Sequence, residues 1–301
     1  MQDAAGAVGE PGTGRDRPVV EVDGLTYAYP GTDEPAVRDV SFAIREGEIV
    51  GFLGPSGAGK STTQKVLTGL LDDYEGSARV FGRQVADQGG DYYERIGVSA
   101  ESPTSYRKLT ARENLELFGS LYAREVMEPE AALALVGLAD DADRRVAEFS
   151  KGMAMRLNLA RALAHDPELL FLDEPTNGLD PANARVVKDL VRERRDSGAT
   201  VFLTTHDMGV ADELCDRVAF IVDGELPVVD APKALKLAHG EQTVRVEYRA
   251  DGQLLVEEFP LAELSADGRF AELLARGVET IHTEEATLED VFIAVTGEPL
   301  R

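Results

Sequence analysis

The sequence is poor in cysteine and in long apolar runs, and each shortage excludes a class of protein. Its single cysteine, Cys215, rules out an intramolecular disulfide and disfavours a cysteine-based metal site, so we interpret it as a small core residue. No stretch approaches the roughly 18 apolar residues of a membrane helix, and residues 1–17 lack the apolar core of a signal peptide. We therefore expect a cytoplasmic chain with a disordered leader at residues 1–17.

Basic residues are also scarce. The chain has 31 Lys and Arg against 55 Asp and Glu, a net charge of −24 and a pI near 4.5. Binding of nucleic-acid phosphates needs clustered Lys and Arg, so nucleic acid is disfavoured as a partner. Lysine is especially rare, and abundant carboxylates with few lysines suit a high-salt cytoplasm that screens their repulsion. We infer a halophilic source, with an ordinary acidic protein as the alternative.

The order of the apolar segments predicts an α/β fold, because the 43% hydrophobic content is that of a globular chain. Strand patterns fill residues 19–54, and a helix follows from Lys60. Residues 110–164 read mostly as helix, and buried strands then alternate with helices from 169 to 224. We expect a parallel sheet with an inserted helical subdomain at about 103–164, together forming a main domain at residues 18–238.

The pattern of apolar and polar residues changes after residue 238. Two alternating runs flank a glycine-containing turn at 243–259, and a helix, a strand and a last helix are expected at 261–277, 278–283 and 287–297. We predict a small α+β accessory domain at residues 239–301.

A phosphate-binding loop follows the apolar strand that ends near residue 53. It matches G-x-x-x-x-G-K-[ST] and consists of Gly54, Pro55, Ser56, Gly57, Ala58, Gly59, Lys60 and Ser61. Glycines allow successive N–H groups to turn inward around an anion, and the helix N-terminus adds partial positive charge. We expect Lys60 to reach the β- and γ-phosphates, Ser61 to bind Mg²⁺, and Thr62 to hydrogen-bond the α-phosphate.

Two further groups end neighbouring strands of the predicted sheet. Asp173 and Glu174 follow the apolar run Leu169–Leu172, and His206 follows the strand ATVFLTT. Strand ends of a parallel sheet meet at one edge, so these side chains should face the same phosphates as Lys60. We predict that Asp173 holds Mg²⁺, that Glu174 is the general base for the attacking water, and that His206 contacts the γ-phosphate.

Together these motifs resemble the ABC ATPases. The signature of that family has its counterpart in Phe149-Ser150-Lys151-Gly152-Met153, which directly precedes a helix. The segment Pro175–Asp180 looks like the D-loop, with Asp180 reaching across a dimer, and Tyr29 looks like the aromatic that stacks on adenine, with Tyr27 as its competitor. The resemblance spans about residues 20–224.

The resemblance implies a P-loop NTPase fold with a RecA-like core, an antiparallel β subdomain and a helical subdomain. It implies that ATP and Mg²⁺ bind between two copies of the chain, where Ser150, Lys151 and Gly152 of one copy close on the phosphate loop of the other. Two departures stand out: Glu101 replaces the usual Gln of the Q-loop and could still ligate Mg²⁺ or water, and Lys151 and Met153 replace the usual Gly and Gln of the signature.

The accessory domain resembles the ending of ATPase subunits of ABC-2-type exporters, which power a separate six-helix permease. This implies a subunit that hydrolyses ATP on the inner face of the membrane, held there by its permease. We also predict that the permease docks near Tyr106 and Leu109. The alternative is a soluble ABC ATPase outside transport, of which the iron–sulfur assembly type is the hardest to exclude. The transported substrate is not readable from this chain.

Overall fold

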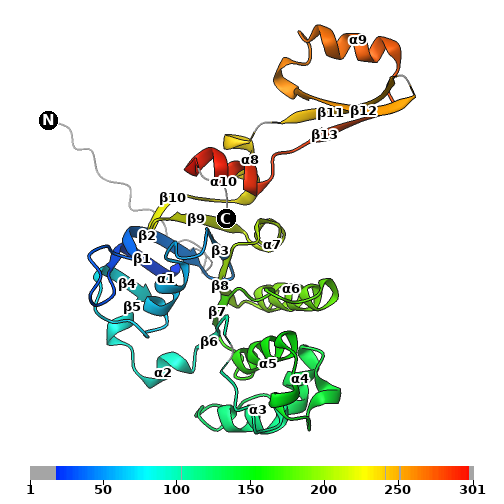
Figure 1. The fold of residues 1–301 in the computed structure, drawn as a ribbon. Coiled ribbons are helices and arrows are strands. Elements are labelled where there is room, and N and C mark those ends of the chain that lie inside the picture. The colour runs from blue at the N-terminus through cyan, green and yellow to red at the C-terminus, as the bar shows by residue number, and fades with distance from the viewer. Residues whose placement is uncertain (1–17, 103, 241, 251, 298–301) are drawn as a thin grey trace, which may run out of the picture.

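The computed structural model describes residues 18–102, 104–240, 242–250 and 252–297 (Figure 1). The predicted leader at 1–17 lies outside the described residues. A six-stranded sheet forms the middle of the molecule in the order β10-β9-β3-β8-β7-β6. Its strands are β3 (Ile49–Leu53), β6 (Ile96–Ser99), β7 (Leu169–Asp173), β8 (Thr200–Thr205), β9 (Arg217–Val222) and β10 (Glu225–Asp230). All neighbours pair in parallel except β10, which is antiparallel to β9.

The sheet is buried on both faces because its strands are apolar at successive positions. Side chains alternate along a strand, so neighbours enter different hydrophobic clusters. On β3, Ile49 and Leu53 join the cluster on the helical side, whereas Val50 and Phe52 join the cluster on the opposite side. The predicted parallel α/β core is confirmed.

A second, antiparallel sheet covers one side of the core (Figure 1). Its order is β2-β1-β4-β5, formed by β1 (Pro18–Tyr27), β2 (Val37–Arg45), β4 (Glu75–Val80) and β5 (Arg83–Gln84). Helix α1 (Lys60–Leu67) contributes Val66 and Leu67 to the cluster shared with this sheet, and the short α2 (Gly90–Tyr93) precedes β6. The predicted antiparallel β subdomain is confirmed.

Helices cover the other side. Helices α6 (Pro181–Asp196) and α7 (Met208–Leu214) follow β7 and β8, and the helical subdomain contains α3 (Ala111–Gly119), α4 (Pro129–Leu135) and α5 (Lys151–Leu163). Thr110 and Glu113 form a reciprocal capping box at the start of α3. These helices lie inside the predicted 103–164 insertion, although short 3₁₀ turns and loops separate them.

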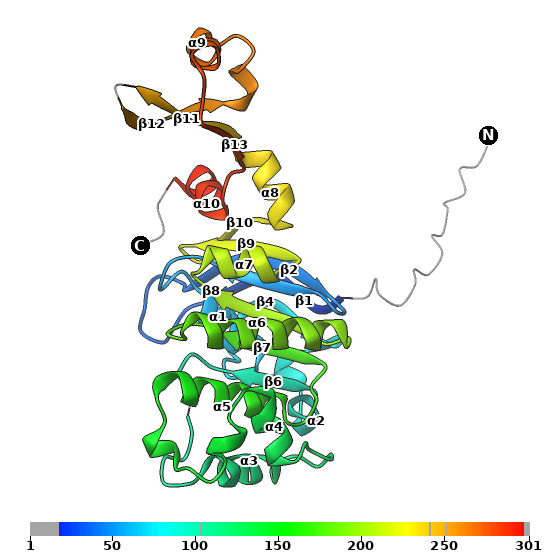
Figure 2. The same cartoon turned by 90° about the vertical axis from the view of Figure 1, so that its right-hand side faces the viewer.

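The accessory part projects away from the core (Figure 2). It is a three-stranded sheet in the order β12-β11-β13 with one helix, formed by β11 (Thr243–Ala250), β12 (Gln253–Pro260), α9 (Gly268–Arg276) and β13 (Thr280–Glu284). We call residues 242–284 the accessory unit. The helix expected over 261–277 is wrong in its first half, because a 3₁₀ turn covers Leu261–Glu263 and Asp267 caps a separate helix from Gly268.

Two helices join the accessory unit to the core. They are α8 (Pro232–His239) and α10 (Leu288–Thr296), and both lie between the large sheet and the accessory unit (Figures 1 and 2). The ring of Phe292 packs against Phe220 of β9, with centroids 5.2 Å apart. The boundary at 238 stays a prediction, but α10, which it assigns to the accessory domain, packs on the core. No helix in the described ranges is long and apolar enough to cross a membrane.

Candidate active site

The predicted phosphate loop connects β3 to α1, and its glycines are required by close backbone contacts. A Cβ on Gly54 would lie 2.1 Å from the carbonyl oxygen of Ile221, and one on Gly59 would lie 2.6 Å from that of Ala36. Gly57 and Gly59 have φ of 85° and 110°, in the region that side chains disfavour. Strand and helix packing therefore fix the loop in a conformation suited to enclosing an anion.

The side chain of Lys60 folds back onto this loop. Its Nζ donates to the carbonyl oxygens of Gly54 at 2.6 Å and Pro55 at 2.9 Å, and the residue is 8% exposed. Burial lowers the pKa of Lys60, whereas the nearby carboxylates of Glu174, Asp173 and Glu101 act in the opposite direction. Lys60 also lines the cavity beside this loop.

Asp173 ends β7 beside the first turn of α1. The hydroxyl of Ser61 lies 3.4 Å from both of its carboxylate oxygens, and the Thr204 hydroxyl donates to its Oδ1. Among the described residues no group of three or more His, Cys, Asp or Glu side chains could hold a metal ion by itself. One carboxylate and one hydroxyl nevertheless fit Mg²⁺, which prefers oxygen ligands and retains waters and substrate phosphates as the others.

Glu174 is the next residue and is 7% exposed. Its φ of 48° lies in the left-handed region, which is strained for a residue with a side chain. The Nδ1 atom of His206 lies 2.7 Å from its Oε1, and the Thr205 hydroxyl lies 3.1 Å from its Oε2. Glu174, the predicted base, and His206, the residue predicted to contact the γ-phosphate, are thus in direct contact.

These residues line one cavity of about 300 Å³. Its walls are Ser56, Gly57, Gly59, Lys60, Ser61, Thr62, Glu101, Asp173, Glu174, Asn177 and His206. Residues predicted from four separate segments therefore meet in one place. Glu101 lies in this wall and accepts a long hydrogen bond of 3.4 Å from the side chain of Asn177.

The two tyrosines considered for the adenine site differ in exposure. Tyr27 is only 6% exposed, whereas Tyr29 is half-buried and its hydroxyl lies 3.2 Å from that of Thr62. The rings pack edge to face with centroids 5.1 Å apart. Tyr29 is the one that remains available to a ligand, which favours the choice made from the sequence.

The signature residues and Asp180 do not line the cavity. Ser150 caps α5 by accepting from the Met153 N–H at 3.2 Å, and Asp180 caps α6. A Cβ on Gly178 would lie 3.4 Å from Nζ of Lys151, and one on Gly152 would lie 3.0 Å from the side chain of Leu179. Within one chain, the signature therefore lies beside Gly178 and Leu179 and outside the cavity wall.

Sequence reasoning missed three residues of the site. Asn177 lines the cavity, and Thr204 and Thr205 hold the two acids, but none of them was given a role. All three lie inside the quoted motifs, so the available signal was their position beside Glu174 and His206.

Comparison with known proteins tests the resemblance. A family model described as ABC transporter matches residues 37–177, and one described as fluoroquinolone efflux ABC transporter C-terminal domain matches residues 242–285. A fluoroquinolones export ATP-binding protein of Mycobacterium tuberculosis is 57% identical over 94% of both chains. A Nod factor export ATP-binding protein of Burkholderia lata is 35% identical over 94% of this chain and 99% of its own.

Solved structures agree. An ATP-binding subunit of an ABC transporter has a TM-score of 0.67 and 29% identity, covering 74% of this chain and 93% of its own. A dimeric ATP-binding cassette bound to ADP and Pi in a post-hydrolysis state has a TM-score of 0.64 and 28% identity, covering 70% and 98%. The names of the relatives support the transport reading and not the iron–sulfur alternative. The chain is a member of the ATP-binding subunits of ABC transporters and has the fold of their ATPase cassettes.

Proposed function

We propose that the chain hydrolyses ATP between two copies of itself and thereby powers export through a separate permease at the inner face of the membrane. The observation that carries this proposal is the placement of Glu174 in the cavity that also contains Lys60, Asp173 and His206. A base, a phosphate-binding cation and a metal-binding carboxylate are the groups that phosphoryl transfer to water requires.

Each group has a defined task in this proposal. The backbone N–H groups of residues 54–62, apart from Pro55, which has none, bind the phosphates together with the ammonium of Lys60. Tyr29 stacks on the adenine. Ser61 and Asp173, with Glu101 in the same cavity wall, would hold Mg²⁺, which would neutralise charge on the phosphates. Glu174 accepts a proton from the attacking water. His206, which contacts the Glu174 carboxylate in this structure, contacts the γ-phosphate when ATP is bound.

The second copy supplies the missing wall. Ser150, Lys151 and Gly152 do not line the cavity of their own chain, but they form the N-terminus of α5, whose partial positive charge favours an anion. We propose that they close on the γ-phosphate of the partner, with Asp180 near the same interface. Two copies then enclose two nucleotides.

The role of Glu174 is tested by Glu174→Gln, which keeps the shape of the side chain. We expect ATP binding to persist, turnover to fall by at least about a hundredfold as expected for loss of a general base, and an ATP-bound dimer to accumulate. Steady-state phosphate release and size-exclusion chromatography with ATP measure both effects. Wild-type turnover in this variant would reject the assignment.

The shared site is tested by mixing two inactive variants. Lys60→Ala removes the phosphate-binding cation, and Ser150→Arg blocks the signature. A mixed dimer has one site with both defects and one site with neither, so activity should return in the mixture but not in either variant alone. Failure of mixing to restore turnover, despite formation of mixed dimers, would contradict the shared site.

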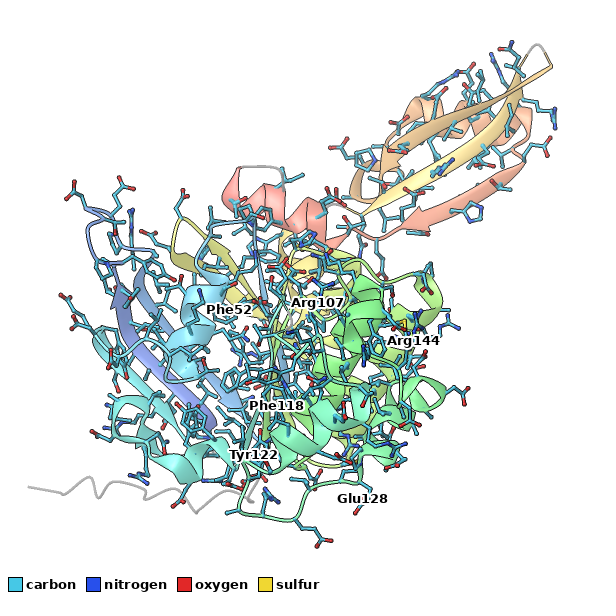
Figure 3. The ribbon with its side chains drawn as sticks, turned by 60° about the horizontal axis from the view of Figure 1, so that its bottom comes forward. Phe52, Arg107, Phe118, Tyr122, Glu128 and Arg144 are labelled. Atoms are coloured by element: carbon cyan, nitrogen blue, oxygen red, sulfur yellow. The ribbon has the colours of Figure 1, made fainter. Side chains whose placement is uncertain are left out.

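The permease is proposed to dock beside the helical subdomain. A cleft of about 630 Å³ there is lined by Tyr93, Phe118, Leu121 and Tyr122 among others, and Figure 3 shows Phe118 and Tyr122 where the helical subdomain meets the β subdomain. Leu121 is 73% exposed, and Tyr106, 57% exposed, packs its ring on Phe118. Exposed apolar side chains around a cleft fit the apolar face of a short helix. Neither Tyr106 nor Leu109 lines the cleft itself, and Leu109 is half-buried.

Docking is tested with Tyr106→Asp and Leu121→Asp. Both should leave the ATPase activity of the isolated subunit unchanged while abolishing co-purification with the permease. Leu237→Asp is a matched control, because Leu237 is 65% exposed on α8, away from this cleft. If Leu237→Asp disrupts assembly and the variants at Tyr106 and Leu121 do not, the docking site lies elsewhere.

The relatives also suggest a first substrate to examine. The protein of Mycobacterium tuberculosis named for fluoroquinolone export is similar over nearly the whole chain, and the accessory unit matches a family described in the same terms. We propose fluoroquinolone-class drugs as the exported compounds. Accumulation of a fluorescent fluoroquinolone in cells with the intact operon and with the Glu174→Gln variant tests this directly.

A further inference from the structure

Two adjacent threonines at the end of β8 hold two adjacent acids, Asp173 at the end of β7 and Glu174 directly after it. In the parallel register Asp173 lies opposite Thr204, and the Thr204 hydroxyl donates to Asp173 Oδ1. One residue after Thr204 and Asp173, the Thr205 hydroxyl lies 3.1 Å from Glu174 Oε2. Each threonine hydroxyl thus donates to a different acid.

The direction of the Thr205 hydrogen bond follows from its surroundings. Its hydroxyl oxygen accepts from the backbone N–H of Asp207 at 3.0 Å, which leaves its proton for the carboxylate. Thr205 is only 1% exposed, so water does not compete for this bond. A buried hydroxyl with a fixed acceptor contact is a rigid donor.

Glu174 depends on such support. Its backbone N–H donates to the Thr204 carbonyl oxygen at 2.9 Å, and its φ of 48° must be maintained by its neighbours. Oε1 faces His206, whose side chain lines the cavity, whereas Oε2 is bound by the buried Thr205. One oxygen is thus held at the rear and the other is directed toward the reacting groups.

We propose that Thr205 is a positioning residue for the hydrolysis reaction, because its hydroxyl fixes the Glu174 carboxylate so that Oε1 receives the proton of the attacking water. In that step the water oxygen bonds to the γ-phosphorus, the bond from phosphorus to the leaving oxygen of ADP breaks, and the water proton passes to Oε1. Thr205 itself neither gains nor loses a proton. The inference rests on the proposed role of Glu174 as base.

Thr205→Val tests it, because valine keeps the shape and removes the hydroxyl. A hydrogen bond to a charged group corresponds to a factor of about ten to a hundred, so we expect kcat to fall by that factor while KM for ATP stays within about twofold. Thr205→Ser restores the hydroxyl and should recover kcat to within about threefold. Unfolding temperatures of both variants are measured, and assays are run well below them.

Thr204→Val is the matched control on the same strand. It removes the hydrogen bond to Asp173 instead, so it should weaken equilibrium binding of a fluorescent ATP analogue in the presence of Mg²⁺, whereas Thr205→Val should not. Equal losses of nucleotide binding in the two variants would indicate a general structural role and overturn the proposal.

A double variant separates this inference from the proposed function. If Thr205 acts through Glu174, adding Thr205→Val to Glu174→Gln should not lower the residual turnover further. A second full reduction would overturn the positioning role, and so would wild-type kcat in Thr205→Val. Wild-type turnover in Glu174→Gln alone would instead reject Glu174 as the base.

Discussion

The ATPase core and the accessory unit bury their sheets in different ways. Every residue of β3 and β8 in the core is buried, and packed layers lie on both faces. The accessory sheet is covered by α9 on one face only, with a cluster of five buried residues: Val244, Val246, Tyr248, Phe259 and Leu273. Its other face carries Arg245, ion-paired with Glu247 and Glu284. Such surface pairs contribute little to stability.

The difference indicates two parts with separate stabilities. A small three-stranded sheet with one helix buries little apolar area, so it should open at a lower free energy than the core. Its two ends meet on the core: a Cβ on Gly240, just after α8, would lie only 2.2 Å from Cβ of Ala286, just before α10. The accessory unit is thus an insertion whose two ends lie side by side on the core.

The largest effect is expected from replacing a buried phenylalanine by alanine, which we compare between the core and the accessory unit. Phe292→Ala removes a ring that is 1% exposed and packs on Phe220 of β9, so it should lower the free energy of unfolding of the core by about 3–5 kcal/mol. Phe259→Ala removes a similarly buried ring from the accessory unit. It should leave core stability and ATPase activity unchanged. Chemical denaturation with nucleotide binding as the probe measures both, and equal losses would show a single cooperative unit.

A buried histidine, His165, makes the stability of the core sensitive to acid. Burial lowers the pKa of His165, mainly by desolvation, while its hydrogen bond to the Ile96 carbonyl opposes the shift. Below about pH 6.5 the unfolded state therefore binds more protons than the folded state. The contribution of neutral His165 to the free energy of unfolding is complete above that pH and decreases as the pH falls. We expect up to about 1.4 kcal/mol per pH unit relative to His165→Gln. Identical pH profiles would contradict this.

Salt should act on both parts. With a net charge of −24, repulsion among carboxylates is relieved when the Debye length falls to about 3 Å at 1 M salt. We expect the unfolding temperature to rise by a few degrees between low and molar KCl, which corresponds to about 1 kcal/mol. Cooperative unfolding that is unchanged by salt would remove the support for a halophilic source, which stays a prediction.

The smallest effect should follow from the largest deletion. Because residues 240 and 286 adjoin, replacing residues 242–284 by a short Gly/Ser linker should leave α8 and α10 in place. ATPase activity should stay within about twofold of wild type, as a change remote from the site allows. Loss of the core fold in this variant, measured by thermal unfolding, would show that the two parts depend on each other.

Much of the core was predictable because local chemistry determines it. The segment Leu169–Asp173 is apolar at four consecutive positions before its carboxylate, which identifies a buried parallel strand and its functional end. The phosphate loop, Glu174 and His206 lie at such strand ends, and the structure brings them into one cavity.

The remainder depends on contacts that the local sequence does not encode. Strand β10 and helix α8 were missed, because residues 225–239 mix polar and apolar residues without a clear period and are specified by packing on β9 and α10. The helix of the accessory unit was predicted too long, because the apolar residues Leu261 and Leu264 continue its helical spacing of apolar residues across Asp267. Thr205 was passed over because its role exists only in the register of β7 with β8.

The packing of α10 also sets an order of events during synthesis. The hydrophobic cluster that begins with Ile49 is completed by Val291 and Phe292, more than 200 residues later. A ribosome adds about 5–20 residues per second, so the nascent core waits some ten seconds or more for its last layer. During that time the ring of Phe220 lacks its contact with Phe292. The core therefore reaches its full packing only after the accessory unit has been made.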